Sequence, residues 1–381
     1  MKENIKFNLT NVSVTSCSFQ STYDEHTTTE NHMVLCCNPF INFEAQLDAL
    51  FNALQQLTDG QYGTCLFIRF FLSDASNQVH KLQEKIANHN SCATISIIQQ
   101  PPLDGSKIAA WCYFATNMQQ VSNKQHTLFS HNGYQHLWSV GKGDNGSAFD
   151  QTHTLLGNEE KKANELEMSI KENCIRTWFY VQNIDVNYMG MVKARKEFFE
   201  QIGLTNKTHF IASTGIEGKS DSPSSFVRLD SYYVKGLQDG QIQYLQALSH
   251  LNPTYEYGVT FERATAVHYG DRKHIFLSGT ASINNKGEIL YEGDIEKQTY
   301  RMWENCDALL HEANGSLDNL VQMLIYIRDT ADYHIVKQLF DKRFPDTPKV
   351  IVLAPVCRPG WLIEMEGIAI IDNKEKAYSN Y

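Results

Sequence analysis

The chain has 381 residues, of which 42% are hydrophobic and 20% are charged, as in an ordinary globular protein. This composition excludes a disordered or collagen-like chain, and the length predicts roughly two to four structural units, or one large one. The formal net charge of −10 at pH 7 argues against a nucleic-acid partner, because an acidic surface repels a phosphate backbone.

The sequence also gives expectations about location and cofactors. No stretch of about 18 consecutive apolar residues occurs, and the opening residues MKENIKFNLT lack the apolar run of a signal peptide. We therefore expect a cytoplasmic protein that contacts no membrane. The nine cysteines form no CxxC pair, the 14 histidines form no HExxH motif, and no glycine-rich phosphate loop is found. We expect no disulfide framework, no metal and no cofactor.

One pattern of helices and strands recurs three times along the chain. In the first copy it predicts helices over 41–57 and 77–89, and strands over 64–74, 92–105 and 106–115. In the middle copy the same order predicts helices over 164–174 and 187–203, and strands over 175–185, 209–218 and 224–236. The recurrence indicates a repeated structural unit, and three unrelated α+β segments are the alternative.

The last copy is the most complete. It predicts a hairpin over 274–294, a helix over 297–316 and a strand over 320–329. A second helix follows over 331–344, and then two strands over 350–370 that turn at Pro359-Gly360. The unit therefore reads ββαβαββ, and the fold class is α/β (α+β). We predict repeats over 1–120, 121–250 and 251–381 that pack as an intramolecular pseudotrimer. The first repeat is degenerate, and the third carries the candidate catalytic residue.

The last copy also carries distinctive sequence stretches. These are SGTASINNKGEI, QTYRMWENCDALL, LIYIRDTADYHIVKQLF and LIEMEGIAI, over 278–289, 298–310, 324–340 and 362–370. Together they resemble the RidA (YjgF) superfamily, which is also labelled endoribonuclease L-PSP. The resemblance implies a chorismate-mutase-like α/β unit that trimerises and places ligand clefts between neighbouring units. In this chain one polypeptide would supply all three units, giving a monomer, with a dimer left open.

Further stretches point to one branch of that superfamily. RTWFYVQNID, VKARKEFF, STGIEG, FERA and VCRPGWLIEMEG resemble the chorismatases, over 176–185, 192–199, 213–218, 261–264 and 356–367. The resemblance implies a cofactor-free hydrolase that cleaves the enolpyruvyl ether of chorismate or of a similar small anionic metabolite. Phe179 departs from the pattern, since the family has a polar residue within its Trp-x-Tyr motif, and this leaves the substrate open.

Glu364 is the candidate catalytic residue. Cleavage of an enol ether needs an acid that protonates the vinyl carbon, and a buried carboxyl group with a raised pKa suits that task. Glu364 interrupts an apolar, strand-like run, and the equivalent positions in the other copies are Ala109 and Arg228. We therefore expect one catalytic cleft; a solvent-facing or salt-bridged glutamate is the alternative. Glu366, on the same strand face, either tunes Glu364 by charge repulsion or lies outside the cleft.

Cys357 is a candidate wall of the same pocket. If Pro359-Gly360 forms a two-residue hairpin turn, Cys357 pairs with Leu362 and shares a face with Glu364. A nucleophilic thiol needs a neighbouring base or cation, and the sequence places no histidine beside it. We therefore expect an inert side chain, as in the chorismatase subtype that has cysteine here.

The candidate substrate-binding residues are mainly arginines, because carboxylates favour bidentate guanidinium partners. Arg263 and Arg328 lie at strand ends, and Arg176 with Tyr180 would face the cleft from the middle copy. For each arginine, solvation or a local ion pair is the alternative. Lys337 is a weaker candidate, and a surface role is its alternative. Gly279 and Thr280 are candidates because their backbone amides would approach a ligand; the alternative is that the glycine serves a β-bulge or packing.

Two other functions remain open. A RidA-type enamine/imine deaminase relies on an arginine where this chain has Lys349, which lacks a planar fork for a carboxylate. A non-catalytic metabolite-binding protein is the third possibility, since superfamily members have been labelled translation inhibitors or ribonucleases.

Overall fold

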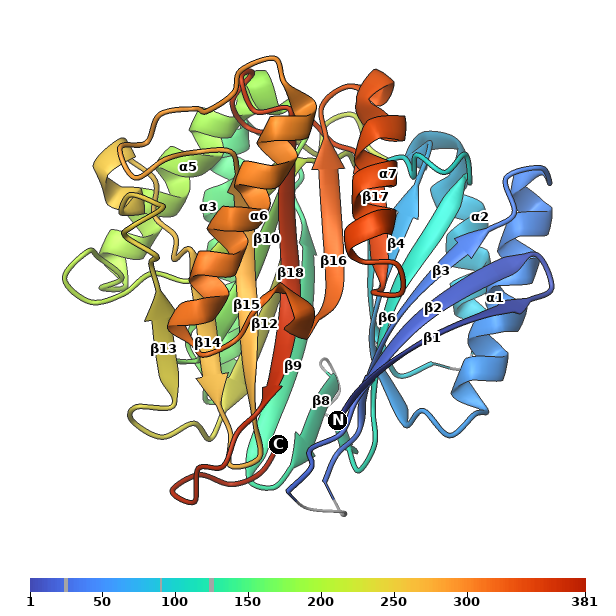
Figure 1. Ribbon diagram of the computed structural model, residues 1–381, viewed down its shortest axis with the longest axis horizontal. Coiled ribbons are helices and arrows are strands. Elements are labelled where there is room, and N and C mark those ends of the chain that lie inside the picture. The colour runs from blue at the N-terminus through green and yellow to red at the C-terminus, as the bar shows by residue number, and fades with distance from the viewer. Residues whose placement is uncertain (24–26, 90, 123–126) are drawn as a thin grey trace.

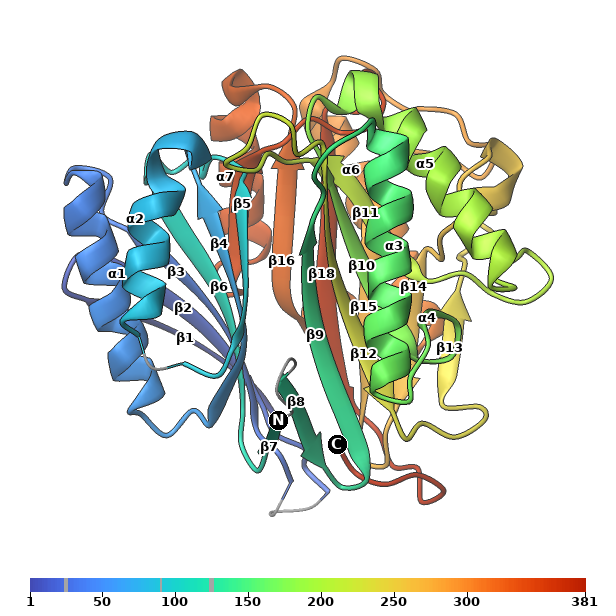
Figure 2. The ribbon, with the colours of Figure 1, turned by 180° about the vertical axis from the view of Figure 1, so that it is seen from behind.

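The computed structural model describes residues 1–23, 27–89, 91–122 and 127–381 (Figures 1 and 2). It contains three six-stranded mixed sheets with the same strand order, which are β1-β2-β3-β6-β4-β5, β7-β8-β9-β12-β10-β11 and β13-β14-β15-β18-β16-β17. In each sheet the last two strands in this order, β4 and β5, β10 and β11, or β16 and β17, pair in parallel, and the other neighbours pair antiparallel. The shared order confirms the predicted α+β class and three tandem units, which we call units 1, 2 and 3.

Unit 1 contains helices α1 (Phe43–Thr58) and α2 (Ala75–Ala87) and strands β1 (Lys2–Leu9), β2 (Val12–Phe19), β3 (Glu30–Cys37), β4 (Thr64–Leu72), β5 (Thr94–Gln99) and β6 (Ile108–Ala115). Helix α1 begins at a side-chain cap, where Asn42 accepts a hydrogen bond from the Ala45 backbone N–H. Strand β6 is buried along its whole length, because one face meets the helices and the other meets the neighbouring units.

Unit 2 contains helices α3 (Ala148–Glu165), α4 (Ile170–Asn173) and α5 (Ile184–Gln201) and strands β7 (Gln119–Ser122), β8 (Thr127–His131), β9 (Tyr134–Lys142), β10 (Cys174–Val181), β11 (Ala212–Glu217) and β12 (Val227–Lys235). Helix α3 begins with a capping box between Ser147 and Asp150. Strand β10 follows α4 directly and is buried throughout.

Unit 3 contains helices α6 (Ile295–Glu312) and α7 (Tyr333–Arg343), the 3₁₀ turns η1 (Thr254–Tyr257), η2 (Leu317–Asn319) and η3 (Thr330–Asp332), and strands β13 (Ile242–Leu245), β14 (Ala264–His268), β15 (Arg272–Ala281), β16 (Leu320–Ile327), β17 (Lys349–Leu353) and β18 (Ile363–Asp372). The long helices of all three units lie on the outside of the molecule, and the sheets face inward (Figures 1 and 2). No helix in the described residues is both long and apolar enough to cross a membrane.

The three sheets share one interior. Trp138 of unit 2 lies 6.3 Å from Trp111 of unit 1, and Tyr232 of unit 2 lies 5.5 Å from Phe276 of unit 3, measured between ring centroids. Backbone hydrogen bonds also join the units in pairs, from Gln99 N to Lys219 O, from Leu353 N to Pro101 O and from Glu217 N to Pro355 O, at 2.9, 2.9 and 3.2 Å. The units therefore pack as a pseudotrimer within one chain.

Two of the predicted hairpins are wrong. Strand β15 pairs with β14, which precedes it, and the segment 282–294 after β15 holds only one isolated bridge between Ile283 and Ile289. Strands β17 and β18 do not pair with each other, because β16 lies between them in the sheet. The segment 354–362 is therefore a long connection, which we call the cover loop, and Cys357 does not pair with Leu362 across a tight turn.

Candidate active site

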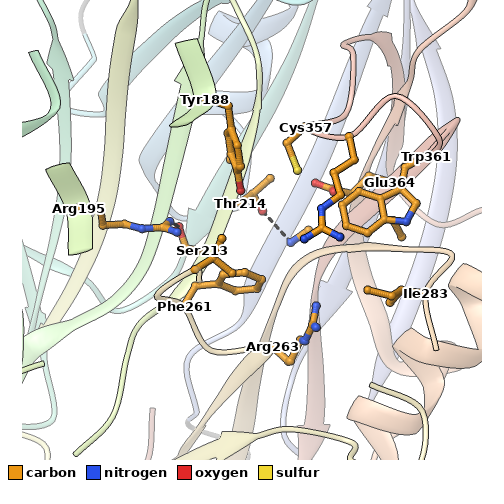
Figure 3. A pocket seen from close by; sticks show the side chains of 15 residues that line it. Tyr188, Arg195, Ser213, Thr214, Phe261, Arg263, Ile283, Cys357, Trp361 and Glu364 are labelled. Carbon is orange, nitrogen blue, oxygen red and sulfur yellow. Dashed lines mark hydrogen bonds between the residues drawn. The ribbon is translucent and has the colours of Figure 1, made fainter. Parts of the chain in front are cut away.

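A cavity of about 50 Å³ lies where unit 2 meets unit 3 (Figure 3). Unit 2 lines it with α5 and β11, and unit 3 lines it with β15, β18, the cover loop and the segment before β14. The Ser213 N–H donates to the Ser278 hydroxyl at 2.8 Å, and the Gly279 N–H donates to the Thr214 hydroxyl at 2.9 Å. These bonds between β11 and β15 hold the two sides of the cavity together.

Glu364 lies on β18 at the wall of this cavity and is 5% exposed. The pKa of its carboxyl group is raised to about 8, chiefly by burial and then by the negative charge of Glu366, while the positive charges of Arg176 and Arg263 act in the opposite direction. A carboxyl group with this pKa keeps its proton at neutral pH. The site therefore holds a buried proton donor, which is the property that general-acid chemistry requires.

Gly279 permits the close approach of β15 to that carboxyl group. The pairing of β15 with β18 shifts register between Leu277 and Thr280, and Gly279 lies within this irregular stretch. A Cβ atom on Gly279 would lie 2.1 Å from Glu364 Oε1. A larger side chain at this position would displace the glutamate. Thr280 is buried outside the cavity lining, and its hydroxyl donates to the Ser278 carbonyl at 3.0 Å.

Glu366 lies in the interior beneath the cavity and does not line it. Its carboxylate accepts hydrogen bonds from Arg176 at 2.8 Å and from the Trp178 indole at 2.7 Å. Arg69 of unit 1 lies 4.0 Å away and forms its own buried ion pair with Asp230 of unit 2 at 2.9 Å. The sequence left open whether Glu366 lies outside the cleft or tunes Glu364 by charge repulsion. In the structure it lies outside the cavity, and its charge opposes ionisation of Glu364.

Two buried arginines reach the cavity from different elements. Arg195 of α5 donates to the hydroxyls of Thr260 at 3.2 Å and Ser213 at 3.3 Å. Arg263 donates to the Asn252 carbonyl oxygen at 3.0 Å. The Phe261 ring lies between the two guanidinium groups, 6.0 Å from that of Arg195 and 5.5 Å from that of Arg263 (Figure 3). The cavity thus has two positive groups on separate sides, which suits a ligand with separated carboxylates.

The cover loop lines the cavity beside Glu364. It contributes Cys357, Arg358 and Trp361, and the Arg358 guanidinium stacks over the Trp361 ring at 4.8 Å. The pKa of the Cys357 thiol is raised to about 12, chiefly by burial and to a smaller extent by Glu364. The thiol is therefore protonated at neutral pH, which fits the expected inert wall.

Two of the predicted binding residues, Arg176 and Tyr180, lie in the interior away from the cavity lining. Arg176 is buried behind it and donates to the Thr214 hydroxyl as well as to Glu366. The Tyr180 ring is buried against Arg69, whose guanidinium carbon lies 5.4 Å from the ring centroid. Their strand β10 turns these side chains toward the shared interior, so the expectation that Arg176 and Tyr180 face the cleft does not match the structure.

Arg328 and Lys337 are occupied elsewhere. Arg328 donates to the Val356 carbonyl oxygen at 2.5 Å and pairs with Asp185 of α5, so it ties the cover loop and unit 3 to unit 2. Lys337 lines a different cavity, between units 3 and 1, and pairs with Asp341 one helical turn away.

Sequence reasoning missed Arg195, Tyr188, Arg358 and Trp361, which all line the cavity. Arg195 carried a usable signal. Met191, Arg195 and Phe198 recur at helical spacing and are all buried, so a charged residue occupies the apolar face of α5. A buried arginine at such a position needs partners or a function.

The protein is thus a pseudotrimer of three tandem α+β units with cavities at their junctions, and comparisons with known proteins identify its family. The family model of Endoribonuclease L-PSP matches residues 263–371. The chain is 34% identical over 97 residues to a RutC family protein of Pyrococcus abyssi, an alignment that covers 25% of this chain and 76% of that protein. The chain therefore belongs to the RidA superfamily, as its third unit shows.

Two longer comparisons extend beyond the third unit. The chain is 26% identical over 223 residues to a 3-hydroxybenzoate synthase of Streptomyces hygroscopicus, covering 51% of this chain and 63% of that protein. A crystal structure of a chorismatase superposes with a TM-score of 0.64 at 17% identity, covering 80% of this chain and 93% of that one. The second likeness shows that the chain has the chorismatase fold.

Proposed function

We propose that the protein is a cofactor-free hydrolase of the chorismatase type, which cleaves the enolpyruvyl ether of chorismate or of a similar small cyclic carboxylate. The observation that carries the proposal is the buried Glu364, whose pKa of about 8 leaves it protonated in a cavity with two arginines. The chorismatase fold and the likeness to a 3-hydroxybenzoate synthase support the choice of substrate class.

In the proposed reaction, the Glu364 carboxyl group gives its proton to the terminal vinyl carbon of the enolpyruvyl group. The carbon that bears the ether oxygen becomes an oxocarbenium ion, and water adds to it while the Glu364 carboxylate takes up the proton that water releases. The hemiketal hydroxyl then gives up its proton, the ring oxygen takes up a proton, and the bond between that oxygen and the hemiketal carbon breaks. The products are pyruvate and a ring alcohol that keeps its own oxygen.

Arg195 and Arg263 are the proposed anchors for the substrate carboxylates, because planar guanidinium groups bind carboxylates through paired hydrogen bonds. The cavity of about 50 Å³ is smaller than the roughly 150 Å³ of a cavity that admits one benzene ring, so it has to widen for a ring with two carboxylates. The cover loop is the part that we propose moves aside. Its closure would then exclude bulk water from the proton donor.

The deaminase alternative receives no support from the geometry. Lys349 lines the junction between units 3 and 1, where it pairs with Asp341 at 3.2 Å. Strand register makes Ser213 the unit 2 counterpart of Lys349, and it is Ser213 that lines the cavity of Glu364. A deaminase of the expected kind would need an arginine at Ser213.

A coupled assay with lactate dehydrogenase, which follows pyruvate release from chorismate, tests the proposal. Pyruvate release by the wild type is expected. Ammonia release from 2-aminoacrylate without pyruvate release from chorismate would instead favour the deaminase.

A further inference from the structure

We propose that the junction between units 1 and 2 holds a second binding site, which takes a small carboxylate with an apolar ring. This junction contains a cavity of about 200 Å³, distinct from the cavity of Glu364. Unit 1 lines it with α2 and β5, and unit 2 lines it with the ends of β9 and β12 and with residues 219–221.

The second cavity lies at the position that pseudosymmetry makes equivalent to the candidate active site. In unit 3, Glu364 of β18 pairs with Ala281 of β15, and both line the first cavity. In unit 2, Arg228 of β12 pairs with Lys142 of β9, and both line the second. The same place in the fold thus carries a proton donor in one junction and a pair of cations in the other.

The charges of the second cavity favour an anion. Lys142 is neutralised by Asp221, at 2.9 Å, and Asp221 also accepts a hydrogen bond from the Ser220 hydroxyl at 2.6 Å. In the part of the chain that the structure describes, neither Arg228 nor Lys219 forms a salt bridge, and the buried Arg228 Nε has no hydrogen-bond acceptor. A carboxylate would supply the missing acceptor and balance the excess positive charge.

The unit 1 side of the cavity is mainly apolar. Val79 of α2 and Ile95 and Ile97 of β5 line it, together with Ala75 and one polar residue, Gln83. A dry cavity of about 150 Å³ lined by apolar side chains admits benzene, so a cavity of about 200 Å³ has room for one ring and its carboxylate. This amphipathic lining selects a ring with a single acidic group over inorganic phosphate. Because no acid stands at the position of Arg228, a bound molecule would not be hydrolysed there.

Crystals grown with 3-bromobenzoate test the inference, since anomalous scattering locates the bromine. We expect bromine in the cavity of Arg228 in the wild type. Calorimetric titration of 3-bromobenzoate then tests whether Arg228 binds the carboxylate. Arg228→Gln is expected to weaken binding at this site at least tenfold, and Arg228→Lys is expected to restore most of it. Lys286→Gln, which removes one exposed charge elsewhere, is the matched control and should bind as the wild type does.

Three outcomes would overturn the inference: no bromine in this cavity, equal binding by wild type and Arg228→Gln, or equal binding of the uncharged 3-bromobenzamide. If Arg228→Gln does not fold, Lys219→Gln gives the same comparison. Neither measurement uses pyruvate release, so the second site stands or falls independently of the proposed hydrolase activity.

Discussion

The chemistry assigned to Glu364 depends on two residues that do not take part in it. Gly279 lets β15 approach the carboxyl group closely, and Glu366 adds a negative charge beneath it. Arg176 neutralises Glu366 through a bond of 2.8 Å, which limits how far the pKa of Glu364 rises. The proton affinity of Glu364 is thus set by burial and by the interior ion pair between Arg176 and Glu366, which lies two residues after Glu364 on β18.

The raised pKa of Glu364 predicts how rate and stability depend on pH. The rate constant kcat should fall tenfold per pH unit above pH 8, because the proton donor is then ionised. Between the ordinary value of 4.5 and 8, the folded protein keeps a proton that the unfolded chain loses, so stability falls as pH rises, by up to about 1.4 kcal/mol per unit.

Glu364→Gln removes this titration and should be more stable than the wild type at pH 8. Urea unfolding of both proteins at pH 5 and pH 8 checks the stability change. A wild-type kcat that stays flat up to pH 10, with equal stabilities at pH 8, would contradict a buried neutral glutamate.

At the scale of elements, the sequence predicted helices α1, α2, α5, α6 and α7 and strands β4–β6, β10–β12 and β15–β18, because their apolar spacing is regular. It did not predict helix α3 or the leading strands of each unit, which are β1–β3, β7–β9, β13 and β14, and it placed a helix over 164–174 where the structure has the short α4. Strand β1 has mostly exposed side chains, so no apolar face marks it. The sequence also joined β17 to β18, because local pattern cannot show that β16 intervenes. Local pattern also cannot show which residues of different units meet. The sequence therefore identified Glu364, Arg263, Cys357 and Gly279, which belong to one unit, but missed Arg195, which α5 brings from the neighbouring unit.

Arg195 should therefore matter for substrate binding. Arg195→Gln is expected to raise KM for chorismate at least tenfold with a smaller effect on kcat, because it removes an anchor and leaves the proton donor in place. Arg195→Lys should recover part of the loss, since it keeps the charge without the planar fork. An unchanged KM for a folded Arg195→Gln variant would exclude the arginine as an anchor.

The whole molecule shows what covalent linkage of three units permits. Separate chains would place identical residues at every junction, whereas here the position of Glu364 is taken by Arg228 in unit 2 and by Ala109 in unit 1. The units still depend on one another, because Arg69 of unit 1 and Asp230 of unit 2 pair with no exposed surface on either side chain. The repeat boundaries at 1–120, 121–250 and 251–381 stay a prediction.

Breaking that ion pair should destabilise the whole protein. Arg69→Met leaves the Asp230 carboxylate buried without its partner, and we expect a loss of about 3–5 kcal/mol in the free energy of unfolding. The double variant Arg69→Met/Asp230→Leu should be more stable than the single one, because no unpaired charge remains. Urea denaturation followed by tryptophan fluorescence measures both; a single variant as stable as the wild type would refute this account of the interface.

The most direct test of the proposed function is pyruvate release from chorismate in water enriched in ¹⁸O, by the wild type and by Glu364→Gln. We predict that the wild type releases pyruvate, that its ring alcohol carries no ¹⁸O, and that Glu364→Gln is at least about 100-fold slower. Full activity of the variant, or ¹⁸O in the ring hydroxyl, would contradict protonation of the enolpyruvyl group by Glu364.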